Sequence, residues 1–252
     1  MKLVIVGGTG LIGSKLVTNL REHGHEAVPA SPDTGVNTLT GKGLADVLQG
    51  ASVVVDVSNS PSFEEKAVMD FFTTSTRNIL QCATAARVTH YVALSVVGTE
   101  RIPDSPYLRA KNVQETLIKG GGIPYSIVHA TQFFEFVKRI ADEATVGTTV
   151  RLPPVLFQPM AADDVAKAVG RVAVSAPVNG TVEVAGPQQF RFDELIRQGL
   201  AAYHDRREVV ADPHARYFGA ELNERSLVPS GEARLGDIRF DEWLAQPAVP
   251  HR

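Results

Sequence analysis

Short apolar runs alternate with longer amphipathic segments along the first half of the chain. The runs expected to form strands are 3–6, 25–30, 51–57, 90–98 and 124–130, with a further short extended piece at 36–39. The segments whose apolar positions share one helical face are 11–22, 42–49, 64–86 and 106–119. This alternation predicts an α/β fold in which a doubly wound parallel sheet is covered by helices on both faces.

The pattern changes near residue 145, where prolines and short extended pieces begin. We expect residues 1–145 to form the core and residues 146–252 to form a smaller, substrate-side segment that returns to it, within one continuous domain. The later elements are expected at 163–174 (helix), 179–186 (strand), 190–203 (helix) and 240–246 (short helix). The polar, loop-rich stretch 210–236 places Tyr217 and Phe218 at an expected lid.

A glycine-rich turn joins the first strand to the first helix in the sequence MKLVIVGGTGLIG. Its glycines satisfy both GxxGxxG and GxGxxG, which in this strand-to-helix context predict a Rossmann-type site for a dinucleotide. Glycine permits the tight turn, the approach of a pyrophosphate and close helix packing, and the helix amino terminus favours an anion. The alternative is a glycine-rich turn without a ligand. The residues expected to hold the cofactor here are Gly7, Thr9, Gly10, Leu11, Ile12 and Gly13.

The ends of the next two strands indicate how the rest of a dinucleotide would be held. Ser31 follows the second strand and could bond a 2′-phosphate, whereas Asp33 could bond a 2′-hydroxyl or simply its own turn. We favour NADP over NAD. Ser58 and Asn59 follow the third strand and either line the cofactor site or form a plain turn before Pro61.

A second motif carries candidate acid–base chemistry. Ser105 and Pro106 are typical of a helix start, so Tyr107 and Lys111, four residues apart, should lie side by side on that helix. A tyrosine has a pKa near 10, which a neighbouring ammonium lowers. Tyr107 could then serve as general acid in reduction. The alternative is an exposed surface pair in which Lys111 bridges to Glu115.

Three features together resemble the short-chain dehydrogenase/reductase superfamily: GGTGLIG at the start, Ser95 at the end of a strand, and YLRAK twelve residues later. More narrowly, the chain resembles its atypical, NmrA-like and NAD(P)H-binding branch. The resemblance implies that Lys111 also binds the nicotinamide ribose and that Ser95 polarises the substrate oxygen. Many extended members carry an asparagine where this chain has Phe72, so a proton relay through that residue is not expected, and Asn78 is interpreted as structural.

The loop after the fifth strand should approach the reacting groups. Thr131, Gln132 and Phe133 are expected near the nicotinamide or the substrate, while His129 is interpreted as packed or hydrogen-bonded. No His, Cys, Asp and Glu set has the spacing of metal ligands, and no serine lies in a GxSxG elbow.

Composition narrows the class of protein. A net charge of −3 gives no electrostatic reason for binding nucleic acid or an anionic membrane. The single cysteine, Cys82, excludes an intrachain disulfide, and the first apolar run is too short for a secretory leader, so we expect a cytoplasmic protein. A monomer or a homodimer is expected.

Three functions agree with these features. The first is an NAD(P)H-dependent oxidoreductase that acts on a small carbonyl or alcohol with assistance from Tyr107, Lys111 and Ser95. The second is a non-enzymatic dinucleotide-sensing regulator of the NmrA-like kind. The third is an epimerase or dehydratase that uses transient oxidation and the same residues.

Overall fold

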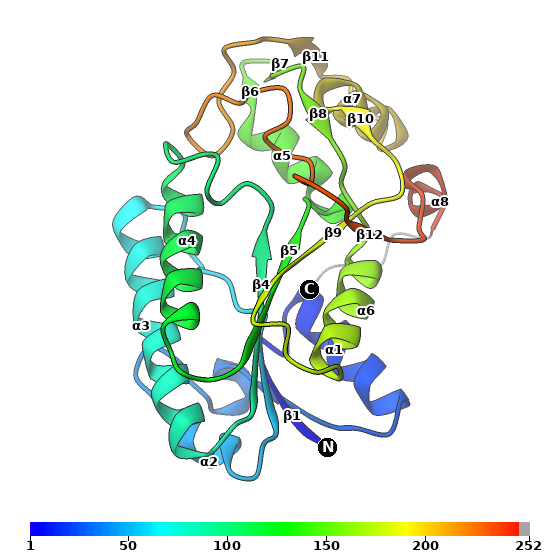
Figure 1. The fold of residues 1–252 in the computed structure, drawn as a ribbon. Coiled ribbons are helices and arrows are strands. Elements are labelled where there is room, and N and C mark those ends of the chain that lie inside the picture. Colours follow the sequence, from blue (N-terminus) through cyan, green and yellow to red (C-terminus); the bar gives the residue numbers. More distant parts are fainter. Residues whose placement is uncertain (247–252) are drawn as a thin grey trace.

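The structure, a computed structural model, describes residues 1–246, and within them a parallel sheet of seven strands forms the centre of the molecule (Figure 1). Residues 247–252, the end of the predicted substrate-side segment, lie outside the described part. The strands, in order across the sheet, are β12 (Arg234–Leu235), β9 (Gly180–Ala185), β5 (Tyr125–Ala130), β4 (His90–Val96), β3 (Val53–Asp56), β1 (Lys2–Val6) and β2 (Glu26–Ala30). The predicted α/β, Rossmann-like fold is confirmed.

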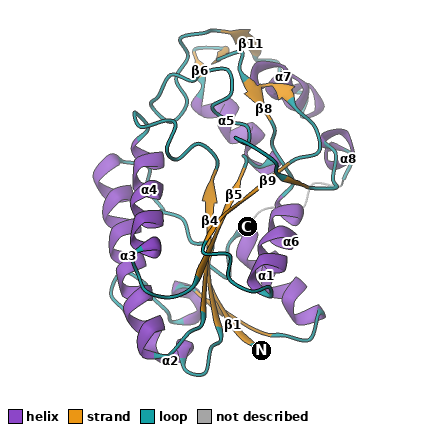
Figure 2. Ribbon diagram, viewed as in Figure 1, coloured by secondary structure: helices purple, strands orange, loops and turns teal. Residues whose placement is uncertain are grey.

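Helices cover both faces of this sheet (Figures 1 and 2). On one face lie α1 (Leu11–Glu22) and α6 (Ala162–Ala173), whose buried side chains join a core with those of β1, β3 and β5. On the other face lie α2 (Leu44–Leu48), α3 (Glu65–Ala85) and α4 (Pro106–Lys119). The two-sided cover explains why a strand such as β3 is buried at every position, with valines at 53–55, rather than alternating.

A smaller layer lies beyond the carboxyl ends of the strands. Its elements are η2 (Phe134–Phe136), α5 (Val137–Glu143), β6 (Thr145–Val146), β7 (Thr149–Leu152), β8 (Leu156–Phe157), β10 (Phe190–Arg191), α7 (Phe192–Ala202), β11 (Glu208–Ala211) and α8 (Phe240–Leu244). They share a separate apolar core, and α5, which precedes residue 145 in the chain, packs on α7 within it. Because β9 and β12 return to the main sheet, the chain crosses between the two parts repeatedly.

The predicted start of α4 agrees with the structure. The Ser105 hydroxyl accepts a hydrogen bond from the Leu108 N–H at 3.4 Å and so caps α4, with Pro106 in the first turn. One expectation was wrong: residues 36–39 form no strand after the 3-10 helix η1 (Pro32–Thr34), because 36 and 37 are irregular and turns follow at 38–40. The Asn78 side chain donates to the Thr38 and Leu39 carbonyls, so it holds these turns against α3 as a structural residue.

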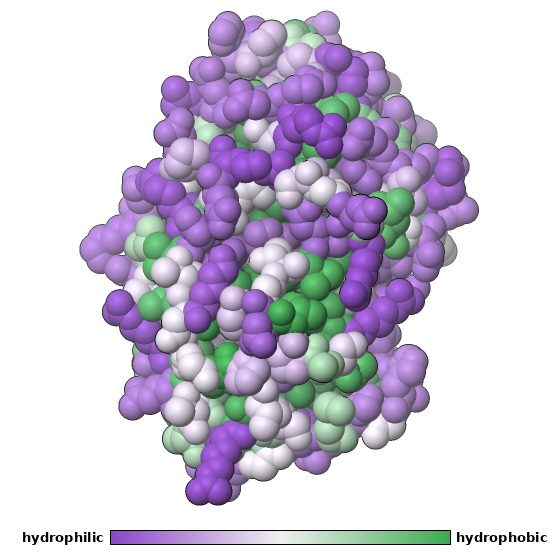
Figure 3. Space-filling view, viewed as in Figure 1, coloured by the Kyte–Doolittle hydropathy of each residue, from purple (hydrophilic) through white to green (hydrophobic). Residues whose placement is uncertain are grey.

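The surface is largely polar, with apolar side chains gathered near the centre of the face shown in Figure 3. Among residues 1–246, no helix combines the length and the apolar character needed to cross a bilayer.

Candidate active site

A cavity of about 650 Å³ lies where the carboxyl ends of β1, β3, β4 and β5 meet the smaller layer. In a parallel sheet these ends share one edge, which is where ligands bind in open α/β folds. The cavity runs from the glycine turn, past the loops after β2 and β3, to α4 and the loop 211–233. All the predicted catalytic and substrate-contacting residues belong to its wall: Ser95, Tyr107, Lys111, Thr131, Gln132 and Phe133.

Three glycines shape the end of the cavity at α1. Gly7 has a φ of +79°, which gives the turn its left-handed residue. A Cβ on Gly13 would lie 2.1 Å from the Gly7 carbonyl oxygen, so only glycine allows α1 to pack this closely. A Cβ on Gly10 would meet only that same oxygen, at 3.3 Å, and otherwise open space. The turn is therefore tight on one side and accessible at Gly10.

The amino end of α1 is free to meet an anion. Gly10 is its cap residue, no described side chain caps it, and its first turn holds no acidic residue. The exposed N–H groups and the helix dipole favour a negatively charged ligand such as a pyrophosphate. The predicted cofactor residues Gly7, Thr9, Gly10, Leu11 and Ile12 line the cavity here, whereas Gly13 lies behind it as the packing contact.

Further along the wall, three buried polar atoms have no hydrogen-bond partner in the described part of the chain. They are Ser31 Oγ, Thr131 Oγ1 and Gln132 Oε1, and all three residues line the cavity. Buried polar atoms are rarely left unpaired, so these groups fit a ligand that supplies hydrogen-bonding partners. Together with the glycine cradle they fit a dinucleotide.

Asp33 does not contribute to the cavity wall. It is exposed and accepts a hydrogen bond from the Thr9 hydroxyl at 3.3 Å rather than from its own backbone. Ser31, Asn37 and Thr38 are the polar residues after β2 that line the cavity. Neither lysine nor arginine lines this end among residues 1–246.

Asp56, at the end of β3, organises the next part of the wall. Its carboxylate accepts from the Ser58 N–H at 3.0 Å and the Ser58 hydroxyl at 2.6 Å, and from Gln114 Nε2 at 2.9 Å and the Tyr91 hydroxyl at 3.2 Å. Ser58 and Asn59 both line the cavity as predicted. The Ser58 hydroxyl, however, is already bound within the protein.

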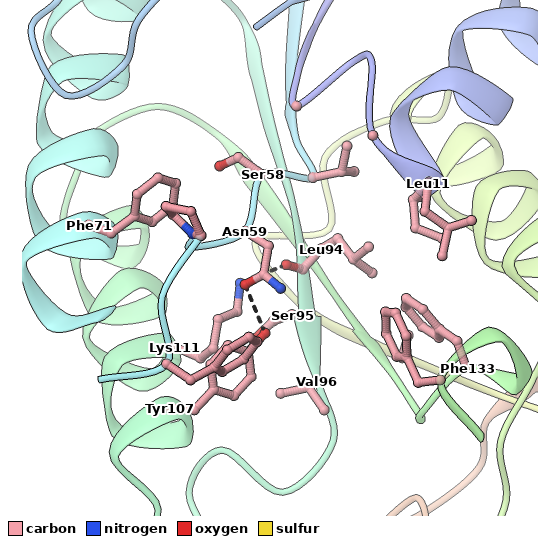
Figure 4. Close-up of a pocket in the computed structure, with 18 of the residues that line it drawn as sticks. Leu11, Ser58, Asn59, Phe71, Leu94, Ser95, Val96, Tyr107, Lys111 and Phe133 are labelled. Atoms are coloured by element: carbon pink, nitrogen blue, oxygen red, sulfur yellow. Dashed lines mark hydrogen bonds between the residues drawn. The ribbon is translucent and has the colours of Figure 1, made fainter. Parts of the chain in front are cut away.

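Tyr107 and Lys111 lie on the face of α4 that borders the cavity (Figure 4). Lys111 is only 3% exposed, so the alternative of a solvated surface pair is wrong. Its ammonium donates to the Leu94 carbonyl at 2.9 Å and to Gln114 Oε1, not to Glu115. The Tyr107 hydroxyl donates to Asn59 Oδ1 at 3.3 Å.

The electrostatics of this pair differ from the simple expectation that the lysine activates the tyrosine. Burial raises the pKa of Tyr107 to about 12, against the opposing effects of Arg139 and the hydrogen bond to Asn59. Burial also lowers the pKa of Lys111 to about 8, while Asp56 and Glu115 oppose that change. At neutral pH Tyr107 is therefore a protonated phenol beside a charged lysine.

Phe72 occupies the place beside this pair. The Lys111 ammonium lies 4.5 Å from the centre of the Phe72 ring, and the Tyr107 ring lies 6.1 Å from it, edge-on. A cation over an aromatic face is stabilised without any exchangeable proton. The residue therefore packs the pair and relays no proton.

The Ser95 hydroxyl makes its hydrogen bond to Glu115 and not to Tyr107. It donates to Glu115 Oε1 at 2.6 Å, and the same oxygen lies 2.8 Å from His129 Nε2. Burial opposes ionisation of Glu115, yet the hydrogen bonds from His129 and Ser95 lower its pKa. His129 is hydrogen-bonded as interpreted, and Ser95 belongs to a buried network one helical turn beyond Lys111.

Sequence reasoning missed the residues that hold Tyr107 and Lys111 in place. Gln114 links Lys111 to Asp56, and Asp56 had one signal, a lone carboxylate at the end of an apolar strand. Gln114 lies three residues after Lys111, which places both on one helical face. Phe63 and Arg139, which also line the cavity, had no local signal.

No protein-family model matches the chain. Among curated proteins it is similar to the photosystem II assembly factor Ycf39 of Cyanophora paradoxa, with 22% identity over 78% of this chain and 67% of the relative. Ycf39 of Synechocystis sp. is also 22% identical, over 78% and 66%. The chain thus spans about two thirds of the length of these relatives.

Solved structures share the fold. A dTDP-glucose 4,6-dehydratase from Streptomyces venezuelae, solved with NAD, matches with a TM-score of 0.74 at 17% identity over 97% of this chain and 95% of its own. RMD from Pseudomonas aeruginosa, solved with NADPH, matches with a TM-score of 0.70 at 15% identity over 96% of each chain. A dTDP-4-dehydrorhamnose reductase from Clostridium acetobutylicum matches with a TM-score of 0.68 at 17% identity over 84% of each. These likenesses show a shared fold, which is the fold that the resemblance to the short-chain dehydrogenase/reductase superfamily implied.

Proposed function

We propose that the chain binds a reduced nicotinamide dinucleotide along this cavity and reduces a carbonyl compound, with Tyr107 as the proton donor. One observation carries the proposal: Tyr107 and Lys111 open into the same cavity as the glycine turn and the unpaired polar atoms of Ser31 and Thr131. A glycine cradle alone would fit any anionic ligand, but a phenol and a buried ammonium at its other end fit proton transfer.

The residues present divide the work of holding the cofactor. The amino end of α1 would meet the pyrophosphate, Ser31 the adenosine ribose, and Thr131 with Gln132 the carboxamide. When bound, the reduced nicotinamide supplies a hydride. We favour NADPH because the Ser31 hydroxyl is free, and we expect modest discrimination because no cation lines that end in the described structure.

Tyr107 is suited to donate a proton rather than to remove one. Its pKa of about 12 keeps the phenol protonated throughout the neutral range. The Lys111 ammonium, held by Leu94 and Gln114, would stabilise the phenolate that remains after transfer. Ser95 could polarise a substrate oxygen only after its hydroxyl leaves Glu115, so we assign it a supporting role.

The test is the replacement of Tyr107 by phenylalanine, which removes the proton and keeps the ring. We expect turnover of a carbonyl panel, followed by nicotinamide absorbance, to fall at least about 100-fold, while NADPH affinity changes little. The matched control is Tyr203→Phe, an exposed tyrosine on the smaller layer that lines no part of the cavity. Unchanged turnover in Tyr107→Phe would contradict the assignment.

A second candidate is a dinucleotide-responsive binding protein. Two observations favour it: the curated relatives are named as assembly factors, and the Ser95 hydroxyl is bound to Glu115. The same panel separates the two functions. NADPH binding without turnover of any carbonyl would favour the binding protein, and the NmrA-like regulators would then be the better comparison.

A further inference from the structure

The half of the cavity beyond the predicted nicotinamide position has aromatic walls. Its aromatic lining residues are Phe63, Tyr107, Phe133, Phe136, Tyr217 and Phe218. They come from four separate parts of the chain: the loop before α3, the start of α4, the segment after β5, and the loop after β11. Six aromatic rings around one space form a wall with a specific chemistry, because rings prefer flat, polarisable partners.

One wall is a cluster of three rings, Tyr107, Phe63 and Phe218, each in contact with the other two. The Phe218 ring lies 5.4 Å from Tyr107 at 24° and 5.5 Å from Phe63 at 29°, and Phe63 lies 5.4 Å from Tyr107. Phe218 holds a left-handed φ of 47°, which is unfavourable for a bulky residue, and Gly219 follows at 83°. The loop thus adopts a strained conformation that places this ring against the proposed proton donor.

The facing wall is a stacked pair of rings. Phe133 and Phe136 are parallel to within 26° with ring centres 5.4 Å apart. Figure 4 shows Phe133 and Tyr107 on opposite sides of the cavity, with Val96 and Leu94 between them. A ligand lying between these walls would contact aromatic faces on both sides.

Charge argues against a nucleotide sugar in this half. Arg139 and Glu143 both line it, with the Arg139 Nε donating to Glu143 Oε1 at 2.8 Å and the guanidinium 4.6 Å from the Phe63 ring centre. The other cation, Lys111, already donates to two acceptors. A diphosphate needs an excess of positive charge, and here the Arg139 charge is balanced by Glu143 in the same wall, while Lys111 is held by other groups.

We propose that the substrate is a planar, uncharged aryl carbonyl compound, held between the Tyr107 and Phe133 walls. This inference rests on the proposed function and narrows its substrate. In the reaction a hydride from the nicotinamide forms the new C–H bond at the carbonyl carbon, so the nicotinamide is oxidised and the carbonyl reduced. The Tyr107 O–H bond breaks as the product O–H bond forms, and solvent returns the proton to Tyr107.

The test compares two ketones with the same carbon skeleton, one aromatic and flat, the other saturated and puckered. 2-Acetylnaphthalene and its saturated counterpart 2-acetyldecalin are titrated calorimetrically into the full chain, with and without NADP⁺, beside dTDP-glucose as the nucleotide-sugar probe. We expect the aryl ketone to bind at least about tenfold more tightly than the saturated one, as two aromatic contacts imply. Equal affinities, or tighter binding of dTDP-glucose, would overturn the inference.

Variants of the aromatic residues test whether the preference for the aryl ketone arises at this wall. Phe218→Leu and, separately, Phe63→Leu should reduce the aryl preference to below about threefold, while Tyr203→Leu, which removes an exposed ring elsewhere, should retain it. An unchanged preference in both wall variants would contradict the site. NADPH consumption is measured in parallel. An aryl preference without consumption of NADPH would refute the proposed reductase and support the aromatic site. Consumption of NADPH with equal affinities for the two ketones would support the reductase and refute the aromatic site.

Discussion

The two ends of the cavity are built in different ways. At the α1 end, the shape comes from glycines within seven residues of one another, and the polar atoms of Ser31 and Thr131 are unpaired. At the α4 end, Tyr107 is surrounded by Phe63 and Phe218, which are distant in sequence, and the polar groups nearby are bound to each other. The first end fits a ligand common to many proteins, whereas the second fits one particular kind of substrate.

This contrast indicates how proteins of one fold can share one ligand and differ in another. The backbone of a glycine turn offers N–H groups and close approach, which depend little on the rest of the chain. The aromatic end depends on where three loops happen to meet. We therefore expect substitutions at the first end to affect folding and cofactor binding, and those at the second to affect proton transfer and selectivity.

The largest effect on folding is expected for Gly13→Ala. The added Cβ would lie 2.1 Å from the Gly7 carbonyl oxygen, which is backbone and cannot easily move. Overpacking typically costs about 1–3 kcal/mol, and we expect the upper end or more. Urea unfolding measures it, with Gly10→Ala as the control, since its Cβ would keep 3.3 Å from the same atom. Equal stability of the two variants would show that α1 is not held this tightly.

The fold could be predicted largely from sequence because its signals are local. The run Leu3–Val6 before glycines, the cap at Ser105 and the amphipathic period of α1 each act over a few residues. The expected extended piece at 36–39 failed because Asn78, on α3, holds residues 38 and 39 in turns. Only the tertiary structure brings the two together.

The next largest effect concerns pH and Lys111. Its pKa is about 8 in the folded chain against an ordinary 10.5, so below pH 8 the folded state carries a costly buried charge. Between pH 8 and 10.5 the unfolded state binds more protons, and stability rises with pH, by up to about 3 kcal/mol for the whole interval. Lys111→Met should lose this rise.

The measurement is the free energy of unfolding of both proteins at pH 7, 8, 9 and 10. The effect of Lys111 is the difference in unfolding free energy between the two proteins at each pH. The comparison is needed because the raised pKa values of Tyr91, Tyr107 and Tyr217 lower the stability of both proteins above pH 10. Parallel curves for wild type and Lys111→Met would show that the lysine is not charged and buried as described.

The smallest effect is expected at the adenosine end. Ser31→Ala removes one hydrogen-bonding group and should weaken NADPH binding about two- to tenfold, with little change for NADH. Asp33→Ala, two residues away, should leave NADPH affinity equal or slightly improved, because it removes a carboxylate from that end. Titrations of both variants with both nucleotides decide between them. A loss of NADH binding in Asp33→Ala would instead favour NAD as the cofactor.

The sequence predicted which residues line the site better than it predicted the hydrogen bonds between them. The four-residue spacing of Tyr107 and Lys111 fixes their common face, and strand ends place Ser58, Ser95 and Thr131 at one edge. The spacing does not reveal that Glu115 takes the Ser95 hydroxyl or that burial raises the pKa of Tyr107. Hydrogen-bond partners and desolvation depend on packing between distant segments, which periodicity does not encode.

The most direct test of the dinucleotide site is a calorimetric titration of the wild type and Gly10→Val with NADPH. Gly10 faces open space apart from one contact, so the variant should fold while its side chain fills the anion cradle. We predict saturable binding by the wild type and affinity at least about 100-fold weaker in Gly10→Val, with unchanged circular dichroism. Equal binding by both proteins, or none by the wild type, would contradict the proposal that this cavity holds a nicotinamide dinucleotide.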